Sequence, residues 1–152
     1  MTWTKLLASR DVQTHRTSKR ELDDFRALIA RDLADAAVAR VSADRRFATA
    51  YNAALLAAHM AIATAGYRVT AKTGHHKVAF DTIVLALGPE AQKYADYFET
   101  CRRKRNVIDY TRSHAATDTE AREILATASE FHAFVEARIQ STSSAKTKRK
   151  VT

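Results

Sequence analysis

The chain of 152 residues contains only one cysteine, one proline and three glycines. The single cysteine, Cys101, excludes a disulfide within the chain and is typical of a reducing compartment. Glycine and proline most often interrupt regular structure, so their scarcity predicts long helices. No apolar run approaches the roughly 20 residues of a membrane span, and the N-terminus lacks the basic-then-apolar order of a signal peptide. We therefore expect a cytoplasmic protein with no membrane association.

Apolar residues recur at helical spacing in four long or medium segments. Ser18 is followed three residues later by Glu21, which is the pattern of a capping box at a helix start. Thr117 and Glu120 repeat this pattern, and Ser42 is a third N-cap candidate. We expect main helices over 18–40, 42–65, 89–111 and 117–139, a shorter helix over 76–87, a docking helix or turn within 1–17 and a loop over 67–77. The predicted fold class is therefore all-α, an antiparallel bundle of four main helices plus a short extra helix.

The segment 43–65 is unusually rich in alanine, which occupies ten of its 23 positions. Small side chains let neighbouring helices approach closely, because they take up less space between the two backbones than larger side chains do. We therefore expect this segment to be the central helix of the bundle.

The chain carries a net charge of +8, and the segment 141–152 supplies four of these charges through lysine and arginine without any acidic residue. Residues 1–140 therefore carry a net charge of +4. Because the segment 141–152 has few apolar residues, we predict a helical-bundle domain over 1–140 followed by a disordered basic tail over 141–152. A basic balance favours polyanionic partners such as RNA, DNA or nucleotides.

Several kinds of chemical site do not fit the sequence. A di-metal bundle site needs a histidine three residues after a glutamate, and the nearest pair, Glu130 and His132, has the wrong spacing. There is no Gly-rich phosphate loop, nucleophile elbow or zinc cysteine pattern. The adjacent residues His75 and His76 diverge by about 100° on a helix, so they do not share one metal, although they could bind a phosphate or shape the turn. We expect no metal and no cofactor.

The basic run 102–105 interrupts an apolar ladder that ends at Cys101 and resumes at Ile108. Arg105 lies between them on the same side of the helix, so its guanidinium is expected to be directed inward. A cation in this position needs a carboxylate, a phosphate or a hydrogen-bond network to receive it.

Two interpretations of this helix remain open from the residues alone. In one, Arg105 and Asp109 form an ordinary i,i+4 ion pair and the other cations are solvated. In the other, Arg105, Asn106 and Tyr110 line a groove that receives a phosphate or an RNA backbone. His114, just beyond the helix, either reaches toward this groove or stands in solvent.

The order of these motifs resembles that of the HEPN domain (higher eukaryotes and prokaryotes nucleotide-binding). In this all-α family an arginine, often followed by asparagine or another polar residue, is followed after four to six residues by a histidine near the end of the third long helix. The matching run here is 105–110, Arg-Asn-Val-Ile-Asp-Tyr, with Tyr110 where the motif has histidine. The segments 50–55, 66–67 and 74–76 are also similar, and the resemblance covers 18–139.

The resemblance implies a role linked to RNA. Catalytic members of the family are metal-independent endoribonucleases, usually dimers in which two motifs face each other. Many are toxins paired with a small nucleotidyltransferase antitoxin, or parts of RNA-targeting defence systems. Histidine titrates near neutral pH whereas tyrosine does not. Because Tyr110 replaces it, the resemblance predicts a homodimeric RNA- or nucleotide-binding module with a degenerate catalytic motif.

Two alternatives remain. The first is an active metal-independent endoribonuclease that uses Arg105 and a nearby histidine as base or acid. The second is a structural helical protein that binds a protein partner. For the RNA-linked functions the candidate catalytic residues are Arg105, Tyr110 and His114, and the candidate RNA-binding residues are Arg102, Arg103, Asn106, Asp109, His75 and His76.

Overall fold

Helices make up most of the chain. The computed structural model describes residues 1–110 and 113–151, with side chains for 1–109 and 113–142. The elements in order are α1 (Trp3–Ala8), β1 (Val12–Thr14), α2 (Lys19–Ala36), α3 (Ala43–Thr64), β2 (Tyr67–Val69), α4 (His75–Leu87), the 3-10 turn η1 (Pro89–Ala91), α5 (Gln92–Tyr110) and α6 (Asp118–Val151). The all-α class is confirmed.

The helices begin at the caps that the sequence predicts. The Ser18 hydroxyl accepts a hydrogen bond from the Glu21 backbone N–H at 3.1 Å, and Ser42 caps α3 in the same way. Before α6 the capping box is reciprocal: the Glu120 N–H donates to Thr117 Oγ1 at 3.0 Å, and the Thr117 N–H donates to Glu120 Oε1 at 2.9 Å. These bonds satisfy backbone donors that a helix start otherwise leaves without partners.

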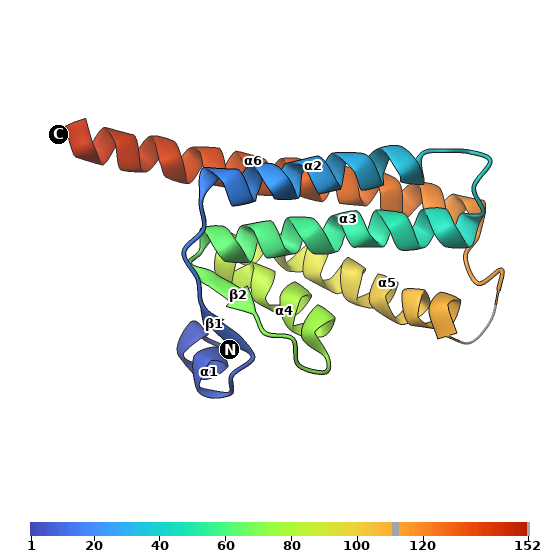
Figure 1. Ribbon diagram of the computed structural model, residues 1–152, viewed down its shortest axis with the longest axis horizontal. Coiled ribbons are helices and arrows are strands. Elements are labelled where there is room, and N and C mark those ends of the chain that lie inside the picture. The colour runs from blue at the N-terminus through green and yellow to red at the C-terminus, as the bar shows by residue number, and fades with distance from the viewer. Residues whose placement is uncertain (111–112, 152) are drawn as a thin grey trace.

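The main helices alternate in direction, as Figure 1 shows for α2 against α3 and for α5 against α6. The predicted antiparallel bundle of four main helices plus a short extra helix, α4, is confirmed. The alanine-rich α3 lies at its centre and packs against α2, α4, α5 and α6. Its alanines at 50, 54, 57 and 58 have no exposed surface, so they provide the close approach that the composition predicts.

By length and composition α3 could also cross a membrane, since its most apolar stretch has a mean hydropathy of 1.2. This stretch is 67% buried inside the bundle. A central core helix meets the same criterion, so the finding is weak evidence for a membrane span.

Two short strands lie where the sequence predicts irregular structure. β1 and β2 pair antiparallel, with Val12 opposite Val69 and Thr14 opposite Tyr67. Trp3 of α1 stacks on the Tyr67 ring with a centroid distance of 4.1 Å. The sheet thus fastens the N-terminal segment to the start of the predicted loop over 67–77. Strands of three residues are too short to produce a recognisable alternation of apolar and polar positions.

Helix α6 continues to Val151, whereas the sequence predicted a helix end at 139 and a disordered tail over 141–152. The difference has a local reason, since this segment contains no glycine or proline and its alanine, lysine and arginine residues favour helix. The side chains of 143–152, including the four basic residues of the predicted tail, lie outside the described part of the structure.

A row of aromatic rings links four helices through the core. Phe131 of α6 lies 5.4 Å from Phe98 of α5, and Phe98 lies 5.3 Å from Phe80 of α4. Phe80 in turn lies 5.7 Å from Tyr51 of α3, and all four side chains are fully buried. The row therefore fixes α3, α4 and α5 relative to one another beneath the site described next.

Candidate functional site

A cavity of about 500 Å³ lies between the start of α4 and the C-terminal half of α5. We call it the α4–α5 cavity. Its lining residues are Thr73, Gly74, His75, His76, Lys77, Arg102, Arg105 and Asn106. Five of the nine residues proposed from the sequence therefore meet in one place, although they come from two segments about 30 positions apart.

Arg105 is directed inward, as its place on the apolar ladder predicts. Its guanidinium lies 5.5 Å from the centroid of the Tyr51 ring, and Nη1 is 3.3 Å from Asp109 Oδ2. Nε is buried and has no hydrogen-bond partner among the described residues. The i,i+4 ion pair of the first interpretation is thus present, but the same side chain also faces the cavity and retains an unused donor.

Arg102 is held by a bidentate pair with Glu99, with N–O distances of 2.9 and 2.8 Å. These hydrogen bonds from Arg102 lower the pKa of the Glu99 carboxyl below its usual value. Arg103 extends away with 77% of its side chain exposed, and Lys104 pairs with Glu120. Of the basic run 102–105, only Arg103 is therefore a largely solvated side chain.

The two histidines of the cavity differ in their surroundings. His76 Nδ1 is 3.2 Å from the hydroxyl of Tyr51, a residue with no exposed surface. Burial, assisted by the neighbouring His75 and Arg105, lowers the pKa of His76 to about 4, so that His76 is neutral at pH 7. His75 is exposed, and its Nδ1 is 3.0 Å from the Lys72 carbonyl oxygen.

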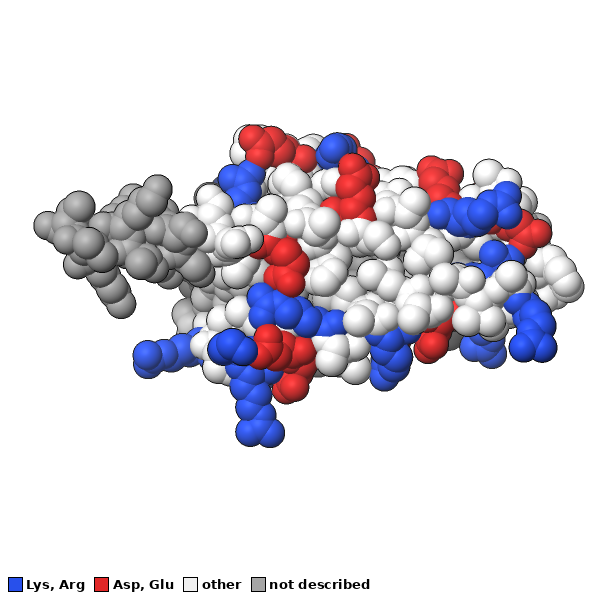
Figure 2. All heavy atoms as spheres, turned by 90° about the horizontal axis from the view of Figure 1, so that it is seen from above, with Lys and Arg blue, Asp and Glu red and all other residues white. Residues whose placement is uncertain are grey.

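The first turn of α4 adds a further positive feature to the cavity. Gly74 stands at the N-cap with a φ of +85°, a left-handed conformation that glycine adopts without strain, and no side chain caps this helix. The positive end of the helix dipole therefore faces the cavity together with Arg102 and Arg105. On the face drawn in Figure 2, which lies on the opposite side of the bundle near α2 and α6, acidic and basic side chains are interspersed.

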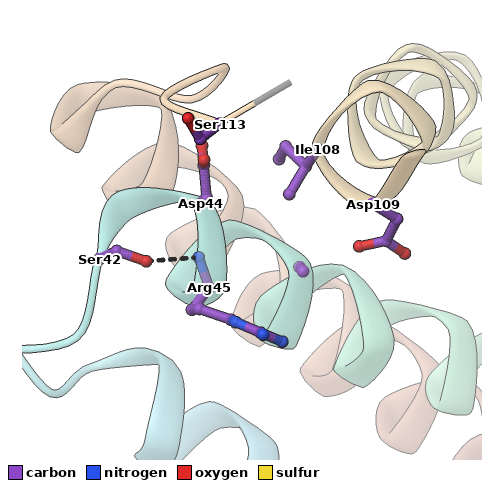
Figure 3. Close-up of a pocket in the computed structure, with 7 residues that line it drawn as sticks. Ser42, Asp44, Arg45, Ile108, Asp109 and Ser113 are labelled. Atoms are coloured by element: carbon purple, nitrogen blue, oxygen red, sulfur yellow. Dashed lines mark hydrogen bonds between the residues drawn. The ribbon is translucent and has the colours of Figure 1, made fainter. Parts of the chain in front are cut away.

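The remaining predicted residues lie outside this cavity. Asp109 lines a second cavity of about 470 Å³ together with Asp44, Arg45 and Ser113, at the start of α3 (Figure 3). The His114 backbone N–H donates to Asp44 Oδ2 at 2.6 Å, which places His114 beside that second cavity instead of the first. Arg103 lines neither cavity, and the side chain of Tyr110 lies outside the described residues.

Residues 36–136 match the family model described as SAV_6107-like HEPN. The chain belongs to the HEPN family. The match contains every residue that lines the α4–α5 cavity of this HEPN domain, while α1, β1 and almost all of α2 precede it. Neither the curated proteins nor the solved structures that were searched gave a match.

Sequence reasoning missed two contributors to the cavity of this HEPN domain. Tyr51 was not among the nine proposed residues, but its ring lies beneath the Arg105 guanidinium and its hydroxyl is 3.2 Å from His76 Nδ1. A signal existed, because a tyrosine on the buried face of an alanine-rich helix needs a partner for its hydroxyl. Lys77 was expected only as part of a basic loop, and it lines the cavity from the first turn of α4.

The lowered pKa of His59 predicts how the free energy of unfolding of the HEPN domain changes at acid pH. His59 lies on α3, and burial lowers its pKa from 6.5 to about 4. The unfolded chain therefore binds a proton here more readily than the folded chain does. The free energy of unfolding should be unaffected by this residue above pH 6.5, and it should fall by up to about 3 kcal/mol as the pH drops to about 4.

Chemical denaturation of the wild type and of His59→Gln between about pH 7.5 and 4 measures this effect. The variant should lose less stability over this range, because a glutamine side chain does not titrate. His76→Gln is the matched variant, since the pKa of His76 is shifted in the same direction to about the same value. Parallel pH profiles for the wild type and His59→Gln would contradict the prediction.

Proposed function

We propose that the α4–α5 cavity binds the phosphate backbone of RNA or a nucleotide, and that this HEPN domain is a binding module of a toxin–antitoxin or defence system with a degenerate catalytic motif. The observation that carries the proposal is the convergence of Arg102, Arg105, two histidines and the start of α4 on one cavity. Arginine offers a planar fork that matches phosphate oxygens, and a helix N-terminus offers free backbone donors.

The lining of the cavity supports an anionic ligand. No carboxylate is found among its lining residues in the described part of the chain, and Lys77 and the two arginines contribute positive charge. Asn106 is exposed and lies one residue beyond Arg105, so its amide can bond to a sugar or a base edge. A polyanion with hydrogen-bonding groups beside each phosphate, such as RNA, fits this combination.

An active metal-independent endoribonuclease is the second candidate, and the position of His75 favours it. Cleavage without a metal needs a proton acceptor for the 2′-hydroxyl and a cation for the developing charge. His75 shares the cavity with Arg105 and Arg102, so both requirements have a candidate. Arg105 would stabilise charge in this function, and His114 would act only if the bound RNA reached beyond the cavity.

We further propose that the HEPN domain acts as a homodimer and that a nucleotidyltransferase is its antitoxin partner. The support is the family membership together with the outer side of α5, where Asn106 and the apolar Val107 are exposed, Val107 by 36%. Two copies that met along this side would bring their cavities close to each other. Sedimentation equilibrium should give twice the mass of one chain, and a monomer at all concentrations would contradict the dimer.

The decisive test of RNA binding compares Arg105→Ala with Arg20→Ala. Both changes remove one positive charge, but the exposed Arg20 lies on α2, outside the cavity. Loss of one charge-assisted hydrogen bond to a phosphate should weaken binding of a labelled single-stranded RNA by about tenfold or more in Arg105→Ala. Arg20→Ala should change the affinity by less than about twofold. Fluorescence anisotropy at fixed salt measures both.

The same RNA, incubated with each protein in the presence of a chelator, separates the two candidate functions. Intact RNA with tight, Arg105-dependent binding supports the binding module. Cleavage by the wild type that is lost in Arg105→Ala supports the endoribonuclease. Equal RNA affinity for the wild type, Arg105→Ala and Arg20→Ala would overturn the proposed site.

A further inference from the structure

The adjacent histidines of the α4–α5 cavity have hydrogen-bond partners of opposite polarity. Nδ1 of His75 is 3.0 Å from the Lys72 carbonyl oxygen, which can only accept. In its neutral form His75 therefore carries its proton on Nδ1, and Nε2 is left with a lone pair. Because His75 is exposed at the cavity, Nε2 is available as an acceptor.

His76 is in the opposite situation. Its Nδ1 is 3.2 Å from the Tyr51 hydroxyl, and this is the only hydrogen bond of that hydroxyl within the described residues. The hydroxyl is fully buried, and burial raises its pKa, so it keeps its proton and needs an acceptor. Tyr51 therefore donates to Nδ1, and the neutral ring of His76 carries its own proton on Nε2.

The Nε2 atom of His76 is free to bind a ligand. It has no hydrogen-bond partner among the described side chains, and His76 is half-buried and lines the cavity. The two rings lie 4.5 Å apart between centroids and are nearly perpendicular. The acceptor on His75 and the donor on His76 thus lie side by side near Arg105, whose guanidinium packs over the Tyr51 ring.

A ribose has the matching polarity, because its 2′-hydroxyl can donate a hydrogen bond and the neighbouring phosphate oxygens can only accept. We propose that His75 Nε2 accepts from a ribose 2′-hydroxyl while His76 Nε2–H donates to the adjacent phosphate, so that the α4–α5 cavity prefers RNA to DNA. This inference rests on the proposed RNA-binding function. It makes His75 the residue that determines specificity, and Tyr51 a positioning residue that sets the tautomer of His76.

Long-range proton–nitrogen NMR of the histidine rings tests the tautomers without any nucleic acid. At about pH 8, above the usual histidine pKa of about 6.5, the spectrum should show Nδ1–H for His75 and Nε2–H for His76. Tyr51→Phe keeps the aromatic ring and removes the hydroxyl, so it should change the signals of His76 and leave those of His75. The inference would be overturned by a spectrum that shows Nε2–H for His75 or Nδ1–H for His76. It would also be overturned if the His76 signals did not change in Tyr51→Phe.

Binding of single strands of one sequence, made as RNA, DNA and 2′-fluoro RNA, tests the preference. The 2′-fluoro strand cannot donate a hydrogen at this position, so the wild type should bind RNA about fivefold more tightly than either analogue. His75→Ala should bind all three strands alike, Arg20→Ala should keep the preference, and Arg105→Ala should weaken all three by a similar factor.

Equal binding of RNA and both analogues by the wild type would overturn the inference while leaving the proposed function intact. Absence of RNA binding would instead overturn the proposed function, and the inferred preference would fall with it. A preference that persists in His75→Ala would also overturn the inference, since it would place the contact to the 2′-hydroxyl elsewhere. A melting curve for each variant verifies that it is folded.

Discussion

Phe98→Ala is expected to destabilise the domain by about 3–5 kcal/mol, because it removes a fully buried ring from the centre of the core. Phe98 packs against Phe80 of α4 and Phe131 of α6, with centroid distances of 5.3 and 5.4 Å, and against its neighbour Tyr97. No other ring in the row 131, 98, 80 and 51 bridges α4 to α6. A small domain has only about 5–15 kcal/mol of stability in total, so a large part of it would be lost.

Urea denaturation followed by circular dichroism measures this loss, and Phe134→Ala is the matched control. Phe134 lies on α6 and contacts Tyr94 at 5.4 Å, but it is only partly buried. Its truncation should therefore reduce the free energy of unfolding clearly less than Phe98→Ala does. Equal losses for the two variants would show that the aromatic row does not dominate the packing between α4, α5 and α6.

The features that the sequence predicted correctly depend on neighbours along the chain. The caps at Ser18 and Thr117 need only a hydrogen bond to a residue three positions on, so the local pattern is sufficient. The inward direction of Arg105 follows from helical periodicity, because Cys101 and Ile108 fix the buried side of the same helix. The central position of α3 follows from its alanine content in the same way.

The features that the sequence did not predict depend on contacts between distant segments. Pairing of Val12 with Val69 joins two segments that each lack a strand pattern. The contact of Tyr51 with both Arg105 and His76 requires α3, α4 and α5 to cross at particular angles, which no local pattern specifies. The position of His114 depends on its hydrogen bond to Asp44, so closeness in sequence to the arginine helix was misleading.

The electrostatic part of the proposed function can be tested more strongly by removing both arginines of the cavity. Each of Arg102 and Arg105 is expected to supply at least one charge-assisted hydrogen bond to phosphate, so the double variant should bind single-stranded RNA about 100-fold more weakly than the wild type. The slope of log affinity against log salt concentration should become shallower by about 1.4, since about 0.7 is lost for each phosphate contact on a single strand. Anisotropy titrations at several salt concentrations give both quantities.

The matched control is a double variant of Arg16 and Arg20, which removes the same net charge from exposed positions at and just before the start of α2. It should retain most of the affinity and almost the whole salt slope. Equal slopes for the two double variants would mean that net charge alone attracts the RNA, and would contradict binding at the α4–α5 cavity.

The same electrostatic argument predicts that a substitution of Glu99 strengthens RNA binding instead of weakening it. Its carboxylate holds Arg102 through two hydrogen bonds of 2.8 and 2.9 Å, so an RNA phosphate must compete with it for the same guanidinium. Glu99→Gln leaves a side chain of the same size but removes the negative charge, which should free Arg102 and strengthen RNA binding several-fold, by roughly 1 kcal/mol. A loss of affinity in Glu99→Gln would show instead that the pair with Glu99 holds Arg102 in the orientation that the phosphate requires.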